Sequence, residues 1–239
     1  MPHAQGLKIA ILINEFSKQT QPMKDAYRTI LATVEPDATI EFFDPINAQE
    51  YPDVAKFDLI VLSGGSVFVM EEVPWVMKMR AFIKSTVETQ PTKKMMGICW
   101  GHQIINVALG GIVEEMGSAD VGVHTIPLTE EGSQFFQGTT LQSSSEFKIQ
   151  QFHKRDVTKP APGLIPLAKN NEAFINEQNT IITFQGHPEM NVEWAYTAAS
   201  GFPAYIALTG YTMEEILESV KIPTDGEAIW RRVLEWVRE

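Results

Sequence analysis

Residues 97–103 read Gly97-Ile98-Cys99-Trp100-Gly101-His102-Gln103 and join an apolar run at 94–98 to a helical pattern at 104–109. The run predicts a strand, and the spacing after it predicts a helix. Glycine two positions before and after Cys99 permits a tight strand-to-helix turn, in which Cβ atoms would otherwise collide. Such a turn presents a thiol at a helix N-terminus, where unpaired N–H groups favour thiolate. We therefore interpret Cys99 as a nucleophile; the alternative is a buried structural cysteine at a strand end.

Short apolar runs alternate with helical patterns on both sides of this turn. This alternation predicts a mostly parallel sheet built through right-handed crossovers. Strands are expected at 8–13, 39–43, 57–62, 94–98 and 180–184, with helices at 23–34 and 75–87. A more β-like middle predicts strands at 121–128 and 146–152 and a hairpin at 164–168 and 172–175. A helical tail follows from about residue 205, and its apolar stripes predict core-facing helices. We expect residues 1–239 to form a single domain.

Composition excludes several classes of protein. The 239 residues include 44% apolar and 21% charged side chains, which is typical of a globular chain. A net charge of -11 repels phosphate, so we expect neither nucleic acid nor an anionic membrane as partner. The single cysteine cannot form an internal disulfide or a cysteine-rich zinc site. With no apolar run long enough for a signal peptide or a membrane span, the sequence predicts a cytoplasmic protein.

Motifs for metals and nucleotides are incomplete. The chain has no G-x-x-x-x-G-K-[ST] loop and no G-x-G-x-x-G fingerprint. His187-Pro188-Glu189 matches the H-x-E of zinc deaminases, but no P-C-x-x-C completes that site. The absence of G-x-S-x-G argues against a serine hydrolase. We therefore expect no metal and no cofactor.

A thiol nucleophile needs a base, and the base needs a group that orients it. Of the five histidines, His187 follows the strand predicted at 180–184, so it is expected at the same sheet edge as Cys99. Glu189 lies two residues further on, where an extended chain points it to the same side as His187. The N–H groups of Gly65 and Trp100 are the expected donors to an oxyanion, because Ser63-Gly64-Gly65-Ser66 ends the strand at 57–62.

These residues resemble those of the class I glutamine amidotransferases. The resemblance rests on the blocks at 97–103 and 185–189, on Ser63-Gly64-Gly65, and on a weaker block at 153–157 with Pro162-Gly163. It implies a triad of Cys99, His187 and Glu189 and a flavodoxin-like three-layer α/β/α fold with a small antiparallel extension. It also implies that Gln103 helps to bind the glutamine portion of the substrate. The implied reaction forms a γ-glutamyl thioester, whose hydrolysis yields glutamate and an amine or ammonia.

Two departures from the family pattern affect single residues. Ser66 stands where many members have proline, which leaves the required backbone N–H in place. The family's His-x-Asp-x-Val block has altered spacing here, so His153 is interpreted as a structural loop histidine rather than a substrate contact.

The resemblance also leaves three functions open. It extends to the stand-alone branch that includes plant γ-glutamyl peptidases, which favours a γ-glutamyl hydrolase acting alone on glutamine or a γ-glutamyl compound. The alternative is a glutaminase subunit that supplies ammonia to a separate synthetase. A third interpretation, from another class, is a catalytically idle binding module on the same fold.

Overall fold

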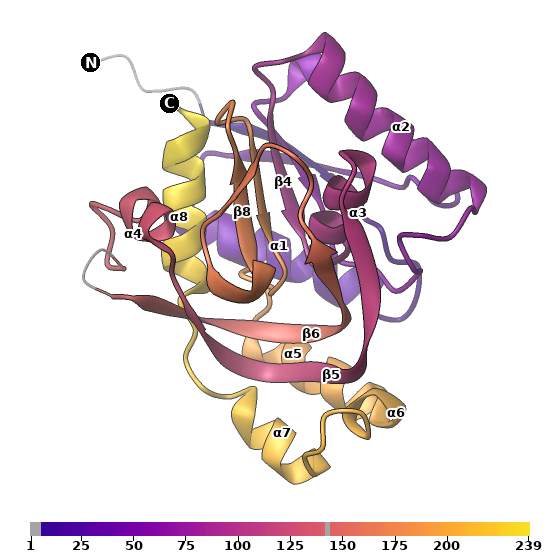
Figure 1. Cartoon of the computed structure of the whole chain (residues 1–239), viewed down its shortest axis with the longest axis vertical. Helices are drawn as coiled ribbons and strands as arrows, with labels where there is room; N and C mark the ends of the chain where they lie inside the picture. Colours follow the sequence, from indigo (N-terminus) through magenta and orange to yellow (C-terminus); the bar gives the residue numbers. More distant parts are fainter. Residues whose placement is uncertain (1–5, 142–143) are drawn as a thin grey trace.

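The computed structural model describes residues 6–141 and 144–239 and builds them around a seven-stranded sheet of order β2-β1-β3-β4-β9-β8-β7 (Figure 1). Five neighbouring strands are parallel, and the last two are antiparallel. The parallel strands are β2 (Thr39–Phe43), β1 (Lys8–Leu12), β3 (Leu59–Leu62), β4 (Lys94–Ile98) and β9 (Ile181–Phe184). The antiparallel strands are β8 (Ala173–Asn176) and β7 (Leu164–Pro166). The predicted parallel sheet and its hairpin extension are confirmed.

Helices cover both faces of this sheet because its central strands are apolar on both sides. In β1, Ile9 and Ile11 pack into one core with α1 (Thr20–Val34) and α8 (Gly226–Val237). Ala10 and Leu12 pack into a second core with α2 (Pro74–Thr89) and α3 (Trp100–Ala108). Figure 1 shows α8 and α2 on opposite sides of the sheet. The architecture is the expected flavodoxin-like three-layer α/β/α sandwich.

A long antiparallel ribbon of β5 (Ile112–Pro127) and β6 (Glu146–Lys159) crosses below the main sheet in Figure 1. Both strands extend beyond the expected ranges 121–128 and 146–152. Most of the added residues are at least partly exposed, and they include charged side chains such as Glu114 and Arg155, so the sequence has no continuous apolar pattern there that predicts a strand. The short helix α4 (Glu130–Phe135) connects the two strands.

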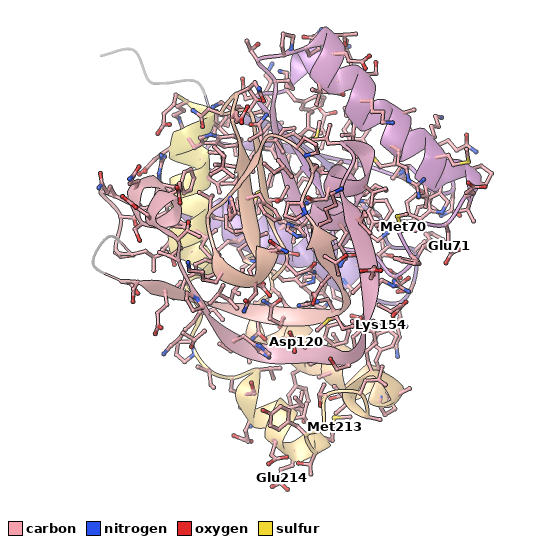
Figure 2. All side chains as sticks on the ribbon, viewed as in Figure 1. Met70, Glu71, Asp120, Lys154, Met213 and Glu214 are labelled. Atoms are coloured by element: carbon pink, nitrogen blue, oxygen red, sulfur yellow. The ribbon has the colours of Figure 1, made fainter. Side chains whose placement is uncertain are left out.

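Four helices follow β9: α5 (Val192–Gly201), α6 (Pro203–Ile206), α7 (Met213–Ser219) and α8. The capping box that Thr212 and Glu215 predict is present at the start of α7. Met213 and Glu214 of α7 lie at the opposite end of the view from α2 (Figure 2). The fully buried Trp230 of α8 confirms that the last helix packs into the core. Helix α5 begins before the expected tail. Single-turn 3₁₀ helices occur at Val54–Lys56 and Lys169–Asn171.

In the ranges that the structure describes, no helix is both long and apolar enough to cross a membrane.

Candidate active site

Cys99 occupies a strained turn between β4 and α3. Its backbone angles are φ 51° and ψ -103°, a region that residues with side chains rarely adopt. A Cβ on Gly97 would lie 2.6 Å from the carbonyl group of Gly101, and one on Gly101 would lie 2.1 Å from the carbonyl oxygen of Leu62. The two flanking glycines are therefore required by close backbone approach, as the sequence predicts. The turn presents a free thiol whose residue is 6% exposed.

Strand register brings the other predicted residues to the same sheet edge. Leu62 at the end of β3 pairs with Gly97, and Ile98 at the end of β4 pairs with Phe184 at the end of β9. The N–H of Cys99 donates to the carbonyl oxygen of Phe184 at 2.8 Å. His187 follows β9 and is fixed by its own N–H, which donates to the carbonyl oxygen of Gln150 in β6 at 2.8 Å. The ribbon thus helps to hold the histidine near Cys99.

His187 and Glu189 form a buried pair. His187 Nδ1 lies 2.9 Å from Glu189 Oε1, and the two residues are 5% and 2% exposed. Burial alone would lower the pKa of His187, but the negative charges of Glu189 and Cys99 outweigh it and raise the pKa to about 10. Glu189 therefore holds the imidazole by one nitrogen and favours its charged form.

Cys99 and His187 interact directly through their charges. Burial alone would raise the pKa of the Cys99 thiol, but the nearby imidazolium of His187 more than offsets this, so the pKa lies below its ordinary value. Cys99 Sγ also lies 4.0 Å from the carbonyl oxygen of Phe152 in β6. Opposite shifts of this kind are typical of a thiolate–imidazolium pair, which is the reactive form of a cysteine nucleophile.

Gly64 and Gly65 line the same cavity as Cys99 and His187, and Trp100 follows Cys99 in the chain. A Cβ on Gly64 would lie 2.8 Å from His187 Cε1, and one on Gly65 would lie 3.2 Å from Trp100 Cγ. Over residues 6–141 and 144–239, neither the Gly65 nor the Trp100 N–H has a hydrogen-bond acceptor. Asn14 braces the loop, because its side-chain amide donates to the carbonyl oxygen of Ser63 at 3.1 Å. The two N–H groups are therefore free to bind an oxyanion.

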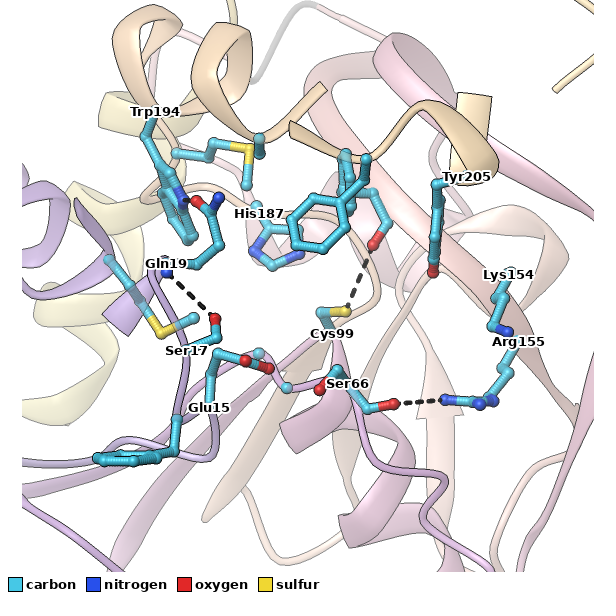
Figure 3. Close-up of a pocket in the computed structure, with 18 residues that line it drawn as sticks. Glu15, Ser17, Gln19, Ser66, Cys99, Lys154, Arg155, His187, Trp194 and Tyr205 are labelled. Atoms are coloured by element: carbon cyan, nitrogen blue, oxygen red, sulfur yellow. Dashed lines mark hydrogen bonds between the residues drawn. The ribbon is translucent and has the colours of Figure 1, made fainter. Parts of the chain in front are cut away.

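A cavity of about 480 Å³ opens over Cys99 and His187, within the size range of small-molecule sites. In Figure 3, Gln19 and Trp194 lie on the His187 side of the cavity, whereas Lys154, Arg155 and Tyr205 lie on the other side of Cys99. The cavity therefore has a cationic end and an end near the histidine.

Gln103 lies beneath this cavity rather than in its lining. It is 4% exposed, and its amide nitrogen donates to the carbonyl oxygen of Arg155 at 2.8 Å and to Gln185 Oε1 at 3.0 Å. The side chain thus braces the backbone that presents Arg155, and its contact with substrate stays a prediction. His153 lies in strand β6 rather than in the expected loop, because the ribbon is longer than predicted. It is 2% exposed, and its Nδ1 lies 3.3 Å from Asp156 Oδ1, which agrees with a structural role.

Several residues of the site were not anticipated from the sequence. Trp194 packs edge-on against His187, with ring centroids 5.8 Å apart at 85°. Tyr205 of α6 stacks on Phe152, with centroids 4.9 Å apart at 13°. Gln19 accepts a hydrogen bond from Trp194 Nε1 at 3.0 Å. None of these residues belongs to a motif. The aromatic composition of residues 194–205 was a signal for Trp194 and Tyr205, whereas Gln19 had none.

The side chain of Trp100 does not belong to the site. The indole of Trp100 faces away from the reacting groups: it stacks on Trp75, and its Nε1 donates to the carbonyl oxygen of Val67 at 2.6 Å. Any role of Trp100 in the predicted oxyanion hole therefore falls to its backbone N–H. Among the described side chains, no group of three or more His, Cys, Asp or Glu is placed to hold a metal ion. His3, one of the five histidines of the sequence, lies outside the described residues.

Comparison with known proteins places this geometry in a family. The profile of the family "Glutamine amidotransferase class-I" matches residues 24–195. A glutamine amidotransferase-like protein of Penicillium rubens is 32% identical over 243 residues, covering 100% of both chains. The chain therefore belongs to the class I glutamine amidotransferases. A crystal structure of a glutamine amidotransferase from Thermotoga maritima shares the fold, with a TM-score of 0.77 at 16% identity over 99% of this chain and 100% of that chain.

Two more distant relatives carry different names. Gamma-glutamyl peptidase 5 of Arabidopsis thaliana is 27% identical over 151 residues, which are 60% of this chain and 59% of the relative. A glutamine-hydrolyzing GMP synthase subunit of Saccharolobus solfataricus is 30% identical over 158 residues, which are 64% of this chain and 77% of the relative. The first name describes a peptidase and the second a component of a synthase.

Proposed function

We propose that this protein is a cysteine-dependent hydrolase of γ-glutamyl amide bonds, acting on glutamine or on a γ-glutamyl compound. The observation that carries the proposal is the pairing of a thiol of lowered pKa on a strained turn with an imidazolium held by Glu189. Membership of the amidotransferase family and the likeness to a γ-glutamyl peptidase support the same chemistry. An idle binding module would not need this arrangement of Cys99, His187 and Glu189.

The reaction begins when Cys99 Sγ attacks the γ-carbonyl carbon and forms a C–S bond. The carbonyl oxygen becomes an oxyanion, which the N–H groups of Gly65 and Trp100 stabilise. The C–N bond then breaks, and the leaving nitrogen takes the proton from His187. In the second half, His187 accepts a proton from water as the water attacks the thioester. The C–S bond breaks, glutamate leaves, and the thiolate–imidazolium pair is restored.

The cationic end of the cavity suits the glutamyl half of the substrate. Lys154 is the freer of its two cations, because its nearest carboxylate oxygen, on Glu115, is 3.9 Å away. Arg155 is held at 2.7 Å by Glu115 and also donates to the carbonyl oxygen of Ser66 at 3.1 Å. We propose that Lys154 attracts the α-carboxylate and that Arg155, braced through Gln103, keeps this end in shape.

Turnover of the Cys99→Ala variant tests the proposal. The wild-type protein and the variant are incubated with glutamine and with γ-glutamyl peptides, and glutamate, ammonia and free amine are measured. We expect the variant to melt as a folded protein and to lose turnover by at least about 10³-fold, because the nucleophile is gone. Hydrolysis retained by the variant would refute the proposal.

A second function, a glutaminase subunit serving a separate synthetase, is favoured by the likeness to a component of GMP synthase. The same assay distinguishes it. Ammonia release that becomes strong only when a synthetase is added supports this second function, whereas turnover by the chain alone supports the hydrolase. A wild-type protein that binds glutamine but hydrolyses no amide under either condition would indicate the binding module.

A further inference from the structure

The cavity is larger than glutamine requires. Water occupies about 30 Å³ per molecule in the liquid, so glutamine, with about ten non-hydrogen atoms, needs at most about 300 Å³ on that scale. The cavity of about 480 Å³ therefore leaves space for a further group on the same substrate. The question is which end of the cavity holds that space.

The proton transfer decides where the leaving group lies. His187 must face the leaving nitrogen in order to protonate it, so the amine half of the substrate lies on the His187 side of Cys99. Lys154 and Arg155 lie on the other side of the sulfur and suit the glutamyl half (Figure 3). The amine half therefore extends toward Trp194, whose ring packs against His187.

One face of α5 forms the wall at that end. Trp194, Ala198 and Phe202 recur at intervals of four residues, so they lie on one side of the helix and its C-terminal cap, and all three line the cavity. Met190 lines the cavity just before the helix. Every one of these side chains is apolar or aromatic. Ammonia, the leaving group from glutamine, gains nothing from such a wall.

Two contacts show that the wall is preformed yet accessible. Trp194 is fixed by the hydrogen bond from its Nε1 to Gln19 Oε1 at 3.0 Å. Phe202 is 36% exposed. Its ring lies 6.1 Å from that of Phe152, and Lys18 Nζ lies 5.3 Å from its centroid, so the part of the ring that these two residues leave uncovered remains available to a ligand. A rigid apolar wall with one accessible aromatic ring binds a planar or bulky apolar group well.

We infer that the α5 wall, consisting of Met190, Trp194, Ala198 and Phe202, is a leaving-group subsite for a large apolar amine. This inference rests on the proposed function and narrows its substrate class. The preferred substrate is a γ-glutamyl dipeptide whose second residue is aromatic or large and aliphatic, rather than glutamine. The wall excludes water from the scissile bond when that side chain is in place.

Substrate preference tests the inference. The value of kcat/KM is measured for γ-glutamyl-phenylalanine, γ-glutamyl-glycine and glutamine. We expect γ-glutamyl-phenylalanine to exceed each of the other two by at least tenfold, which corresponds to about 1.4 kcal/mol. The Phe202→Ala variant should lower the ratio of the phenylalanine to the glycine substrate by at least about threefold. Tyr211→Ala is the matched control, because Tyr211 is 63% exposed and outside the cavity lining, so the ratio should not change.

The outcomes separate the two proposals. Equal kcat/KM for the three substrates would overturn the subsite and leave γ-glutamyl hydrolysis standing. Turnover of none of them would overturn both. A preference for γ-glutamyl-phenylalanine that survives unchanged in Phe202→Ala would overturn the assignment of the subsite to α5. A preference lost in Phe202→Ala and kept in Tyr211→Ala supports it.

Discussion

The strained backbone at Cys99 predicts that glycine is tolerated better at this position than at an ordinary buried position. Two variants are compared, Cys99→Ala and Cys99→Gly, which both lack the sulfur and differ only by a methyl group. The angles φ 51° and ψ -103° are rarely adopted by residues with a side chain, and holding such a residue there costs about 1–3 kcal/mol. Glycine adopts them without that strain.

An ordinary buried position supplies the reference for this comparison. Ala108 lies in α3 and is 4% exposed. Ala108→Gly should lower the free energy of unfolding by about 1–2 kcal/mol, because glycine gains chain entropy on unfolding and a buried methyl group is lost. At position 99, relief of strain opposes the same loss. Relief of about 1–3 kcal/mol against a loss of about 1–2 kcal/mol places the free energy of unfolding of Cys99→Gly between about 1 kcal/mol below and about 2 kcal/mol above that of Cys99→Ala.

Equilibrium unfolding in urea measures both differences. For a chain of this size, 1 kcal/mol also corresponds to a shift in Tm of about 2–4 °C, which gives an independent reading. Each alanine-to-glycine change alters the free energy of unfolding, at position 99 (Cys99→Ala against Cys99→Gly) and at position 108 (wild type against Ala108→Gly). The strain at Cys99 is the difference between these two free-energy changes, and it should be at least about 1 kcal/mol. The reasoning is refuted if Cys99→Gly loses as much stability relative to Cys99→Ala as Ala108→Gly loses relative to the wild type.

Two further predictions concern buried carboxylates. Glu189→Gln removes a charge that raises the pKa of His187, so kcat should fall by on the order of 10²-fold or more with little change in KM. Any alkaline loss of activity should then move below pH 10; an unchanged pH–rate profile would exclude Glu189 from the mechanism. Burial raises the pKa of Glu172 to about 7, so the native state keeps a proton that the unfolded state loses at lower pH. The contribution of Glu172 to the free energy of unfolding is therefore fully present below about pH 4.5. It decreases by up to about 3 kcal/mol as the pH rises toward 7. Glu172→Gln should flatten this slope in unfolding titrations, and an unaltered slope would contradict the assignment.

Several residues of the site could be predicted from short stretches of sequence, because their placement depends on the conformation of the backbone. The glycines around Cys99 are needed for close approach between neighbouring segments, and that need leaves a pattern in the chain. His187 could be placed near Cys99 from topology alone, because parallel strands end at the same edge of a sheet. The buried bond from His187 to Glu189 is likewise expected from their spacing, and the structure has it at 2.9 Å.

Residues whose role depends on side-chain packing were harder to anticipate. Gln103 belongs to the motif, yet its amide is used to brace Arg155 and Gln185 beneath the cavity. The full length of the β5–β6 ribbon was missed because most of the added residues are polar or partly exposed. Periodicity reports which face of an element is buried, but not which polar partner a buried amide finds.

The amino-acid sequence by itself determined the alternation of strands and helices, the parallel pairing that follows from it, and the turn that presents the thiol. Those features leave local patterns in the sequence, namely apolar periodicity and glycine spacing, and the handedness of the crossovers limits how the strands can pair. The shape of the cavity was decided only in the tertiary structure, where α5, α6, the ribbon and the loop before α1 meet over Cys99. Their lining side chains come from segments far apart in the sequence, and no local pattern specifies how such segments pack together.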